Sequence, residues 1–227
     1  MEILTDIAIE LDAEAMAKTA HVDTRSEDGR EFRALVAEAQ QLVRPKAICR
    51  ECYVDARGDD TATISGVVFT SRALRRNLHK VERVFAYVAT CGRELDQVPI
   101  AEGDYLKQFW LDTVKAAALG AALRHMDEQM DRRYGLSKAS VMHPGSGDAS
   151  VWPIEQQRQL FSLLGDVTGL IGVELTDSFL MVPNKSVSGI RFPTEIDFRS
   201  CQLCHREKCP SRSAPFDPEL WESVGQA

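Results

Sequence analysis

The sequence predicts an α+β fold with a largely antiparallel, twisted sheet flanked by helices. Segments with helical and with strand character follow one another irregularly, without the regular β–α–β order that builds a parallel sheet. The 227 residues suffice for one large domain or two small ones. Because no segment resembles a linker, we expect one domain over residues 1–198. An irregular, Cys-rich C-terminal tail is expected over residues 199–227.

Two patterns predict helices in the first third of the chain. Residues 26–43 carry apolar side chains at helical spacing, and Pro45 follows as a stop signal. The apolar face comprises Phe32, Leu35, Val36, Ala39, Leu42 and Val43. Ser71 is a residue type that caps helix N-termini, so a short helix is expected over residues 72–78.

Two further helices are expected in the middle of the chain. Residues 104–134 form one long segment whose centre is mostly small and apolar, which indicates burial on most sides. Gly135 is a typical helix stop. Pro153 suits the first turn of a helix over residues 153–164, and Gly165 closes it.

Strand signals separate these helices. Residues 61–69 are rich in β-branched side chains and predict one strand, and the apolar residues 84–90 predict a second. Three short strands joined by tight turns are expected later, over residues 172–176, 179–183 and 186–192.

The charge balance and the distribution of apolar residues argue against a nucleic acid partner and a membrane-spanning segment. The chain has 27 Lys plus Arg against 34 Asp plus Glu, a net charge of −7, whereas a nucleic-acid binder needs a basic surface. No run of about 18 apolar residues is present, so no membrane-spanning segment is expected. The first residues are acidic where a signal peptide would be basic, which predicts a cytoplasmic protein.

The most informative segment spans residues 144–189. It begins with the glycine-rich loop Pro-Gly-Ser-Gly-Asp and ends with Lys185-Ser186-Val-Ser-Gly. Glycines allow a close approach of the backbone to a ligand or a neighbouring strand. Tight sheet turns with a solvated lysine explain this spacing equally well. The loop matches neither the P-loop nor the Rossmann fingerprint.

This segment resembles the activation domain of cobalamin (vitamin B12)-dependent methionine synthase, and more closely the stand-alone versions of that domain. The family pattern P-x-x-x-Q fits Pro153 and Gln157, and the runs I-G-V-x-L-T-x-S and P-x-K-S-V-S-G fit residues 171–178 and 183–189. A weaker likeness covers residues 89–95, where the family has A-T-x-G-x-E-L.

The resemblance implies a function in corrinoid methyl transfer. In that family the domain binds S-adenosylmethionine, which remethylates a partner's cobalamin after it has slipped from Co(I) to Co(II). The expected partner is therefore a corrinoid-dependent methyltransferase that carries the cobalamin. This chain would be an accessory subunit without catalytic residues of its own. The implied cofactor-binding residues are His143, Pro144, Gly145, Ser146, Lys185 and Ser186.

The chain departs from the family at two positions of the loop that binds the methyl donor. The family reads R-x-x-P-G-Y, whereas this chain has Val141 in place of the arginine and Ser146 in place of the tyrosine. An arginine hydrogen bond to a carboxylate is worth about 1.5–3 kcal/mol. His143, or a cation from elsewhere in the chain, would have to compensate. His143 could equally be an ordinary polar loop residue.

The tail carries a cysteine pattern that suits a metal. Cys201, Cys204 and Cys209 follow the spacing C-x2-C-x4-C, which stand-alone members of the family also share, together with Arg212. Three thiolates this close can wrap zinc or join an iron–sulfur cluster, and the C-x2-C pair Cys49–Cys52 could complete the ligand set if the fold brought it near. The alternative is a set of reduced thiols. Cys91, which ends an apolar strand, is expected to be buried.

Three functions therefore remain open. The first is an accessory subunit for a corrinoid methyltransferase that uses S-adenosylmethionine. The second is a docking or assembly module for a corrinoid protein that no longer binds this methyl donor, which Val141 and Ser146 favour. The third is a thiol–metal redox protein in which the tail is the functional part. No Ser/His/Asp arrangement of a hydrolase can be recognised from spacing.

Overall fold

The computed structural model describes residues 1–195, 198–209 and 212–225. Within them, a seven-stranded sheet has the order β4-β3-β2-β5-β9-β6, and β1 also pairs with β2. All of its pairings are antiparallel, as predicted. The strands are β1 (Glu2–Leu4), β2 (Lys46–Arg57), β3 (Thr61–Ile64), β4 (Val67–Thr70), β5 (Arg83–Thr90), β6 (Ala139–Met142) and β9 (Ser186–Pro193). A separate antiparallel pair joins β7 (Glu174–Leu175) to β8 (Met181–Val182).

Helices flank the sheet, so the predicted α+β class is confirmed. The α-helices are α1 (Ala13–Thr19), α2 (Glu27–Leu42), α3 (Arg72–Asn77), α4 (Tyr105–Tyr134), α5 (Gln157–Leu164), α6 (Val167–Ile171) and α7 (Pro218–Gly225). Three 3₁₀ turns add η1 (Arg93–Gln97), η2 (Ile154–Gln156) and η3 (Ser200–Leu203). None of the helices in the described part of the chain is long and apolar enough to cross a membrane.

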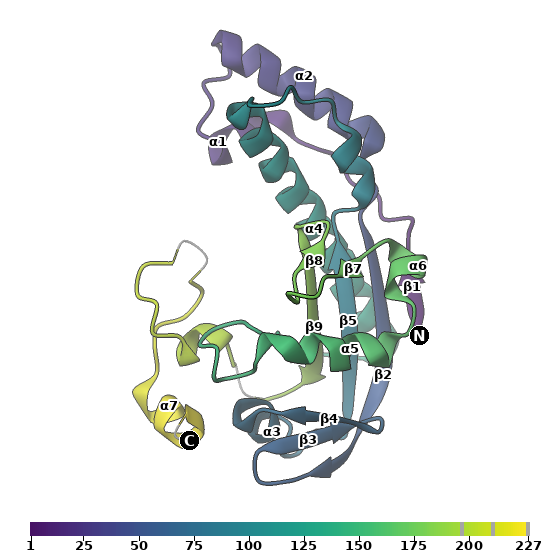
Figure 1. Cartoon of the computed structure of the whole chain (residues 1–227), viewed down its shortest axis with the longest axis vertical. Coiled ribbons are helices and arrows are strands. Elements are labelled where there is room, and N and C mark those ends of the chain that lie inside the picture. The colour runs from purple at the N-terminus through teal and green to yellow at the C-terminus, as the bar shows by residue number, and fades with distance from the viewer. Residues whose placement is uncertain (196–197, 210–211, 226–227) are drawn as a thin grey trace.

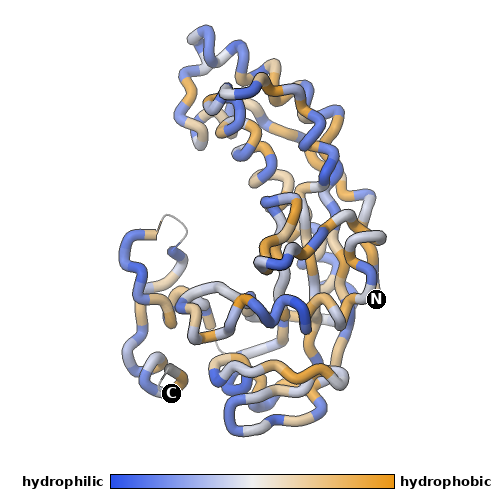
Figure 2. Tube along the Cα trace, viewed as in Figure 1, coloured by the Kyte–Doolittle hydropathy of each residue, from blue (hydrophilic) through white to orange (hydrophobic). Residues whose placement is uncertain are grey.

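The two faces of the sheet are covered by different helices. On one face, β2, β5 and β9 pack against α5 and α6, and Trp152 and Leu160 are fully buried there. On the other face, the second half of α4 buries Met126 and Met130 against Phe85. Figure 2 shows hydrophobic residues both along the strands of the sheet and along the helices that cover it. Burial of both faces explains why β5 is apolar at nearly every position.

A helical lobe extends beyond one end of the sheet (Figure 1). There, α1 and α2 pack on the first half of α4, and Phe32 meets Trp110 edge-on with ring centroids 5.5 Å apart. The lobe and the sheet together form a crescent whose ends are α2 and the β3–β4 hairpin.

The helices predicted over residues 26–43, 72–78 and 104–134 are present, and each begins after a capping residue. Ser26, Ser71 and Asp104 cap α2, α3 and α4, each accepting a backbone N–H with its side-chain oxygen. Gly135 ends α4 in the left-handed conformation. The helix expected over residues 153–164 is correct, although its first turn is the 3₁₀ turn η2.

The single strand predicted over residues 61–69 is wrong, because it is a hairpin. Ser65 and Gly66 both have positive φ angles, 46° and 82°, and join β3 to β4. Two such residues form the two-residue turn whose twist matches that of paired strands. The Ser-Gly dipeptide between two β-branched runs was the available signal.

Several elements had no counterpart among the predictions. These are β1, α1, β2, β6, α6 and α7. Residues 141 and 142 were assigned to a loop but belong to β6, which pairs with β9 at the edge of the sheet. Apart from η3, residues 199–209 and 212–217 of the tail are irregular, and α7, which follows, packs against α3 and η3.

Candidate functional site

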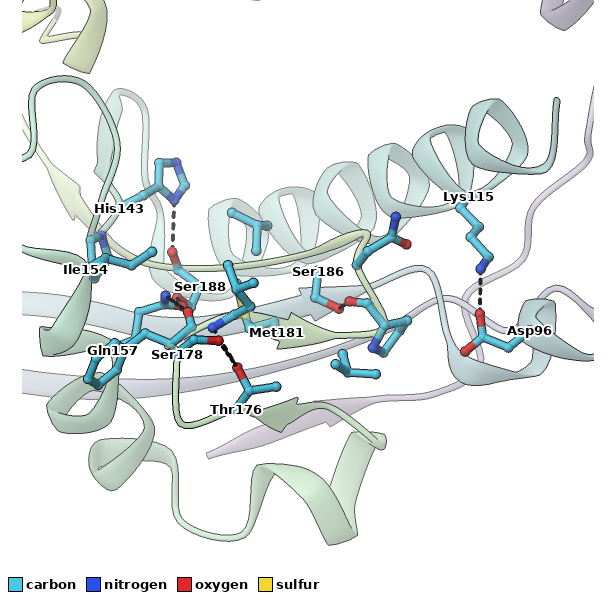
Figure 3. A pocket seen from close by; sticks show the side chains of 17 residues that line it. Asp96, Lys115, His143, Ile154, Gln157, Thr176, Ser178, Met181, Ser186 and Ser188 are labelled. Carbon is cyan, nitrogen blue, oxygen red and sulfur yellow. Dashed lines mark hydrogen bonds and ion pairs between the residues drawn. The ribbon is translucent and has the colours of Figure 1, made fainter. Parts of the chain in front are cut away.

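A cavity opens between β9, the loop before α5 and the segment that joins β7 to β8. We call it the first cavity, and its volume is about 690 Å³. Figure 3 shows His143 and Gln157 at one end and the Asp96–Lys115 pair at the other. The lining residues are Asp96, Lys115, His143, Pro144, Ile154, Gln157, Thr176, Ser178, Phe179, Leu180, Met181, Val182, Pro183, Asn184, Ser186, Val187 and Ser188.

His143 is held over strand β9 at one end of this cavity. Its Nδ1 atom lies 3.0 Å from the carbonyl oxygen of Ser188 and 3.5 Å from the hydroxyl of Tyr87. Gly189 follows in β9, and a Cβ atom there would lie 2.7 Å from His143 Nδ1 and 2.8 Å from the carbonyl oxygen of Met142. The glycine of the Ser-Val-Ser-Gly run therefore makes room for the imidazole.

This setting favours the neutral form of His143. Burial lowers the pKa of its imidazole, and the hydrogen bond to the Ser188 carbonyl opposes that effect in part. The same bond requires the proton on Nδ1, which leaves Nε2 as an acceptor. His143 was expected either as an exposed ligand residue or as an ordinary loop residue, and it is instead half-buried and fixed.

Gln157, the first residue of α5, connects two walls of the cavity. It is buried, accepts a hydrogen bond from the Ser188 hydroxyl at 2.9 Å and donates one to the carbonyl of Phe179 at 2.7 Å. These two bonds tie β9 to the loop that follows β7. Gln157 thereby sets the spacing of the walls around the His143 end.

The loop that follows β7 is a tight turn. The Thr176 hydroxyl accepts the backbone N–H of Leu180 and lies 3.1 Å from the Ser178 hydroxyl. Phe179 has a positive φ of 61°, and its ring lies under the Arg158 guanidinium, 4.9 Å from it. The turn therefore presents hydroxyls and apolar side chains to the same cavity.

The opposite end of the cavity carries charge. Lys115 of α4 pairs with Asp96 of η1 at 2.5 Å, and the lysine side chain is only 13% exposed. Between the two ends, the Ser186 hydroxyl lies 2.8 Å from both the Thr90 hydroxyl and the Pro183 carbonyl. The cavity thus offers a cation, an anion and several hydroxyls, which are donors and acceptors for a polar ligand.

The structure brings only part of the predicted cofactor-binding set together. His143, Pro144 and Ser186 line the first cavity. Lys185 lies beside it, where its ammonium pairs with Asp112 of α4 at 2.8 Å. Gly145 is exposed, and a Cβ atom there would lie 3.0 Å from Ile154.

Ser146 belongs to a second cavity of about 450 Å³ at the outer edge of β6. We call it the second cavity, and it shares His143 with the first. Val141 also lines it, so both positions at which the loop departs from the family face this cavity. The lining residues are Ala139, Ser140, Val141, His143, Ser146, Phe198, Arg199, Ser200, Cys201 and Ser213.

The loop between the two cavities is anchored from both sides. The backbone N–H of Gly145 donates to the Trp152 carbonyl at 2.7 Å, and the buried Trp152 ring meets Phe69 edge-on. On the other side, the tail packs against Gly147, where a Cβ atom would lie 3.1 Å from the Ser200 carbonyl oxygen. The tail thus contacts the loop that carries His143.

Cys49 and Cys52 do not form a metal-binding pair, which corrects the expectation that they could join the tail cysteines. Three residues apart on strand β2, their side chains lie on opposite faces of the sheet, in different core clusters. Burial raises the pKa of Cys49 to about 12 and that of Cys91 to about 11, so these thiols stay protonated. The burial predicted for Cys91 is confirmed.

The three tail cysteines are partly exposed. Within residues 1–195, 198–209 and 212–225, no three His, Cys, Asp or Glu side chains are placed to hold a metal ion. His205, which adjoins Cys204, packs instead against the rings of Phe216 and Trp221. A backbone N–H from Ser213 lowers the pKa of the Cys201 thiol. A zinc or iron–sulfur site at Cys201, Cys204 and Cys209 stays a prediction.

Sequence reasoning missed Gln157 and Lys115 as members of a site. Gln157 fits the family pattern P-x-x-x-Q, but no role in binding was predicted for it. That pattern was the signal that could have identified it as a site residue. Lys115 and Asp96 come from segments that gave no motif, and only the packing of α4 beside η1 brings them to the cavity.

The burial of His143 predicts a pH effect on stability. Because the folded-state pKa lies below the ordinary value of 6.5, the unfolded chain binds more protons as the pH falls through this region. We therefore expect the wild-type protein to lose stability between about pH 7 and pH 5 relative to His143→Asn, measured by urea unfolding. An equal pH dependence of the free energy of unfolding in both proteins would contradict a half-buried, neutral His143.

Two comparisons with known proteins found similarity. Residues 125–206 match the family model described as "Vitamin B12 dependent methionine synthase, activation domain". The fold resembles the crystal structure of the MetH reactivation domain bound to AdoHcy, with a TM-score of 0.55 and 14% sequence identity, over 84% of this chain and 70% of that chain. A search of curated proteins gave no match. The resemblance to the activation domain is thereby confirmed, and the solved structure shows the fold.

Proposed function

We propose that this chain supports the reductive remethylation of a corrinoid protein, with S-adenosylmethionine held in the first cavity as the methyl donor. The observation that carries the proposal is the convergence of the family motifs. Gln157, residues 176–178 and residues 183–188 come from three separate segments, and each contributes to the lining of this one cavity. The related structure has AdoHcy bound.

The size and chemistry of the first cavity suit such a ligand. Its volume of about 690 Å³ falls in the range of small-molecule sites, about 300–1,000 Å³. The amino-acid end of S-adenosylmethionine carries an ammonium and a carboxylate. The ammonium can pair with Asp96 and the carboxylate with Lys115, in place of the ion pair that these two side chains form with each other. The neutral His143 and Gln157 at the other end offer an acceptor and an amide to the nucleoside end.

The roles of the residues are binding and orientation. S-adenosylmethionine supplies an electrophilic methyl group, and the corrinoid that receives it belongs to the partner. Lys115 and Asp96 hold the amino acid, whereas Gln157 and Ser188 keep the wall beside His143 in place. No residue of this chain has to gain or lose a proton in the transfer.

The test is methyl transfer to a corrinoid protein in its Co(II) form. The chain is mixed with that protein, a one-electron reductant and S-adenosylmethionine labelled in its methyl group. We expect label on the corrinoid only when the chain is present, and at least about tenfold less with Lys115→Met, which removes a charge-assisted contact. Equal labelling without the chain would refute the proposal.

A second candidate is a docking module for a corrinoid protein that does not bind S-adenosylmethionine. The favouring observation is that Val141 and Ser146, which stand where the family has arginine and tyrosine, line the second cavity beside the tail. In that case the chain would bind the corrinoid protein with an affinity that S-adenosylmethionine leaves unchanged. Binding of the corrinoid protein measured with and without the methyl donor distinguishes the two candidates.

A further inference from the structure

We propose that Cys201 and Cys204 form a dithiol–disulfide pair, in which Cys201 attacks a small-molecule disulfide that enters the second cavity and Cys204 closes the intramolecular bridge. The proposal is independent of the function assigned to the first cavity. It accounts for the cysteine motif of the tail, to which that function gives no role.

The backbone holds the two cysteines at bridging distance. Cys201 lies in η3, and the N–H of Cys204 donates to the Cys201 carbonyl at 3.3 Å, which closes a four-residue turn. Such a turn keeps its first and fourth Cα atoms within about 7 Å, and disulfides span about 4.4–6.8 Å. A C-x2-C bridge can therefore form without unfolding the tail.

Arg212 fixes this turn from the inside. Its guanidinium donates to the carbonyl oxygens of Cys201 at 3.2 Å and of Cys204 at 2.9 Å, and also to that of Ala214 at 3.0 Å. These bonds are to the backbone and do not depend on the state of the thiols. Arg212 is thus a positioning residue that places both cysteines whether they are reduced or bridged.

The surroundings distinguish Cys201 as the attacking thiol. Its Sγ atom accepts hydrogen bonds from the N–H and the hydroxyl of Ser213, at 3.4 and 3.6 Å, which hold the sulfur in a fixed position. Cys201 lines the second cavity, whereas Cys204 and Cys209 do not. Cys49, Cys52 and Cys91 are buried in the core, out of reach of a substrate.

The second cavity suits a polar, anionic disulfide such as oxidised glutathione. Among its lining residues are the hydroxyls of Ser140, Ser146 and Ser200 and the cation Arg199. Hydroxyls and a guanidinium recognise the carboxylates and amides of such a molecule. About 450 Å³ accommodates one half of it, with its sulfur directed to Cys201.

The reaction is a two-step thiol–disulfide exchange. The Cys201 thiolate attacks one glutathione sulfur, so a mixed disulfide forms and the first glutathione leaves as a thiolate, which takes the proton of Cys204. The Cys204 thiolate then attacks Cys201 Sγ and releases the second glutathione, which is protonated by solvent. Two cysteines lose two electrons in total, and one glutathione disulfide gains them.

The test uses the full chain, reduced and freed of reductant under anaerobic conditions, and mixed with oxidised glutathione at neutral pH. Peptide mapping by mass spectrometry then follows each cysteine. We expect a Cys201–Cys204 disulfide in the wild type and a stable glutathione adduct on Cys201 in Cys204→Ser. Cys201→Ser should react at least about tenfold more slowly, because the attacking thiolate is gone. Cys209→Ser is the matched control and should behave as the wild type does.

Several results would overturn the proposal. They are a Cys201–Cys209 bridge in the wild type, a first adduct on Cys204 or Cys209, or an unchanged rate in Cys201→Ser. Tail thiols held unreactive by a stoichiometric metal would also overturn it. Since the readout is the mass of the cysteine peptides, failure here leaves S-adenosylmethionine binding unaffected, and the reverse also holds.

Discussion

Replacing Gly189 by alanine is expected to destabilise the protein by about 2–4 kcal/mol and to abolish ligand uptake by the first cavity. The new Cβ atom would lie 2.7 Å from His143 Nδ1, 2.8 Å from the Met142 carbonyl oxygen and 3.1 Å from the Tyr87 hydroxyl. The Met142 contact is to backbone of the paired strand β6, so β6 and β9 have to separate locally. His143 then loses its place at the end of the cavity.

Urea unfolding and calorimetric titration with S-adenosylmethionine measure the two effects of Gly189→Ala. Gly120→Ala is the matched control, because Gly120 lies within helix α4 and its added methyl group would meet only the mobile end of Arg124, at 3.3 Å. There we expect unchanged binding and a stabilisation of about 0.5–1 kcal/mol from the better helix former. A Gly189→Ala protein as stable as the wild type would show that β9 does not pack against His143 as described.

Replacing Trp152 by alanine is expected to cost about 3–5 kcal/mol, the usual range for a fully buried tryptophan. The ring is fully buried, meets Phe69 with centroids 5.9 Å apart and donates from Nε1 to Gln156 Oε1 at 3.2 Å. Its carbonyl also accepts the N–H of Gly145. Alanine keeps this carbonyl, but without the buried ring the segment that presents it is no longer held in position. The loop that carries His143 and Pro144 then becomes less well fixed, so ligand affinity should fall with stability.

Trp152→Phe separates packing from hydrogen bonding at this site. Phenylalanine retains much of the ring, and Gln156 Oε1 keeps its bond from the Thr70 N–H at 2.9 Å. We expect a cost of about 1–2 kcal/mol in urea unfolding and ligand affinity close to the wild-type value. If Trp152→Ala lost no more stability than Trp152→Phe, the loop would not depend on this anchor.

Local signals were enough to predict most helices and the fold class. A Ser or Asp cap acts within one turn, so α2, α3 and α4 begin directly after those residues, and Gly135 ends α4. The hairpin of β3 and β4 was missed because Ser65 was taken as a strand residue, although the Ser-Gly pair was visible. Strand β2, whose cysteines drew attention to metal chemistry, was not predicted at all.

The site could be predicted only in part, because a motif shows spacing along the chain and not direction in space. The residues of the Pro-Gly-Ser-Gly loop, predicted to form one binding site, divide between two cavities, with Pro144 in the first and Ser146 in the second. Lys185 was chosen as a ligand cation, but it pairs with Asp112, and Lys115 holds the charged position instead. The positions of both lysine side chains depend on the packing of α4.

An anaerobic calorimetric titration of the purified chain with S-adenosylmethionine tests most directly whether the first cavity holds this methyl donor. We expect saturable binding in the micromolar range, weakened about 10–100-fold in Lys115→Met by the loss of a charge-assisted contact and unchanged in Ser146→Ala. No heat of binding up to millimolar ligand, or an affinity that Lys115→Met leaves unchanged, would contradict it.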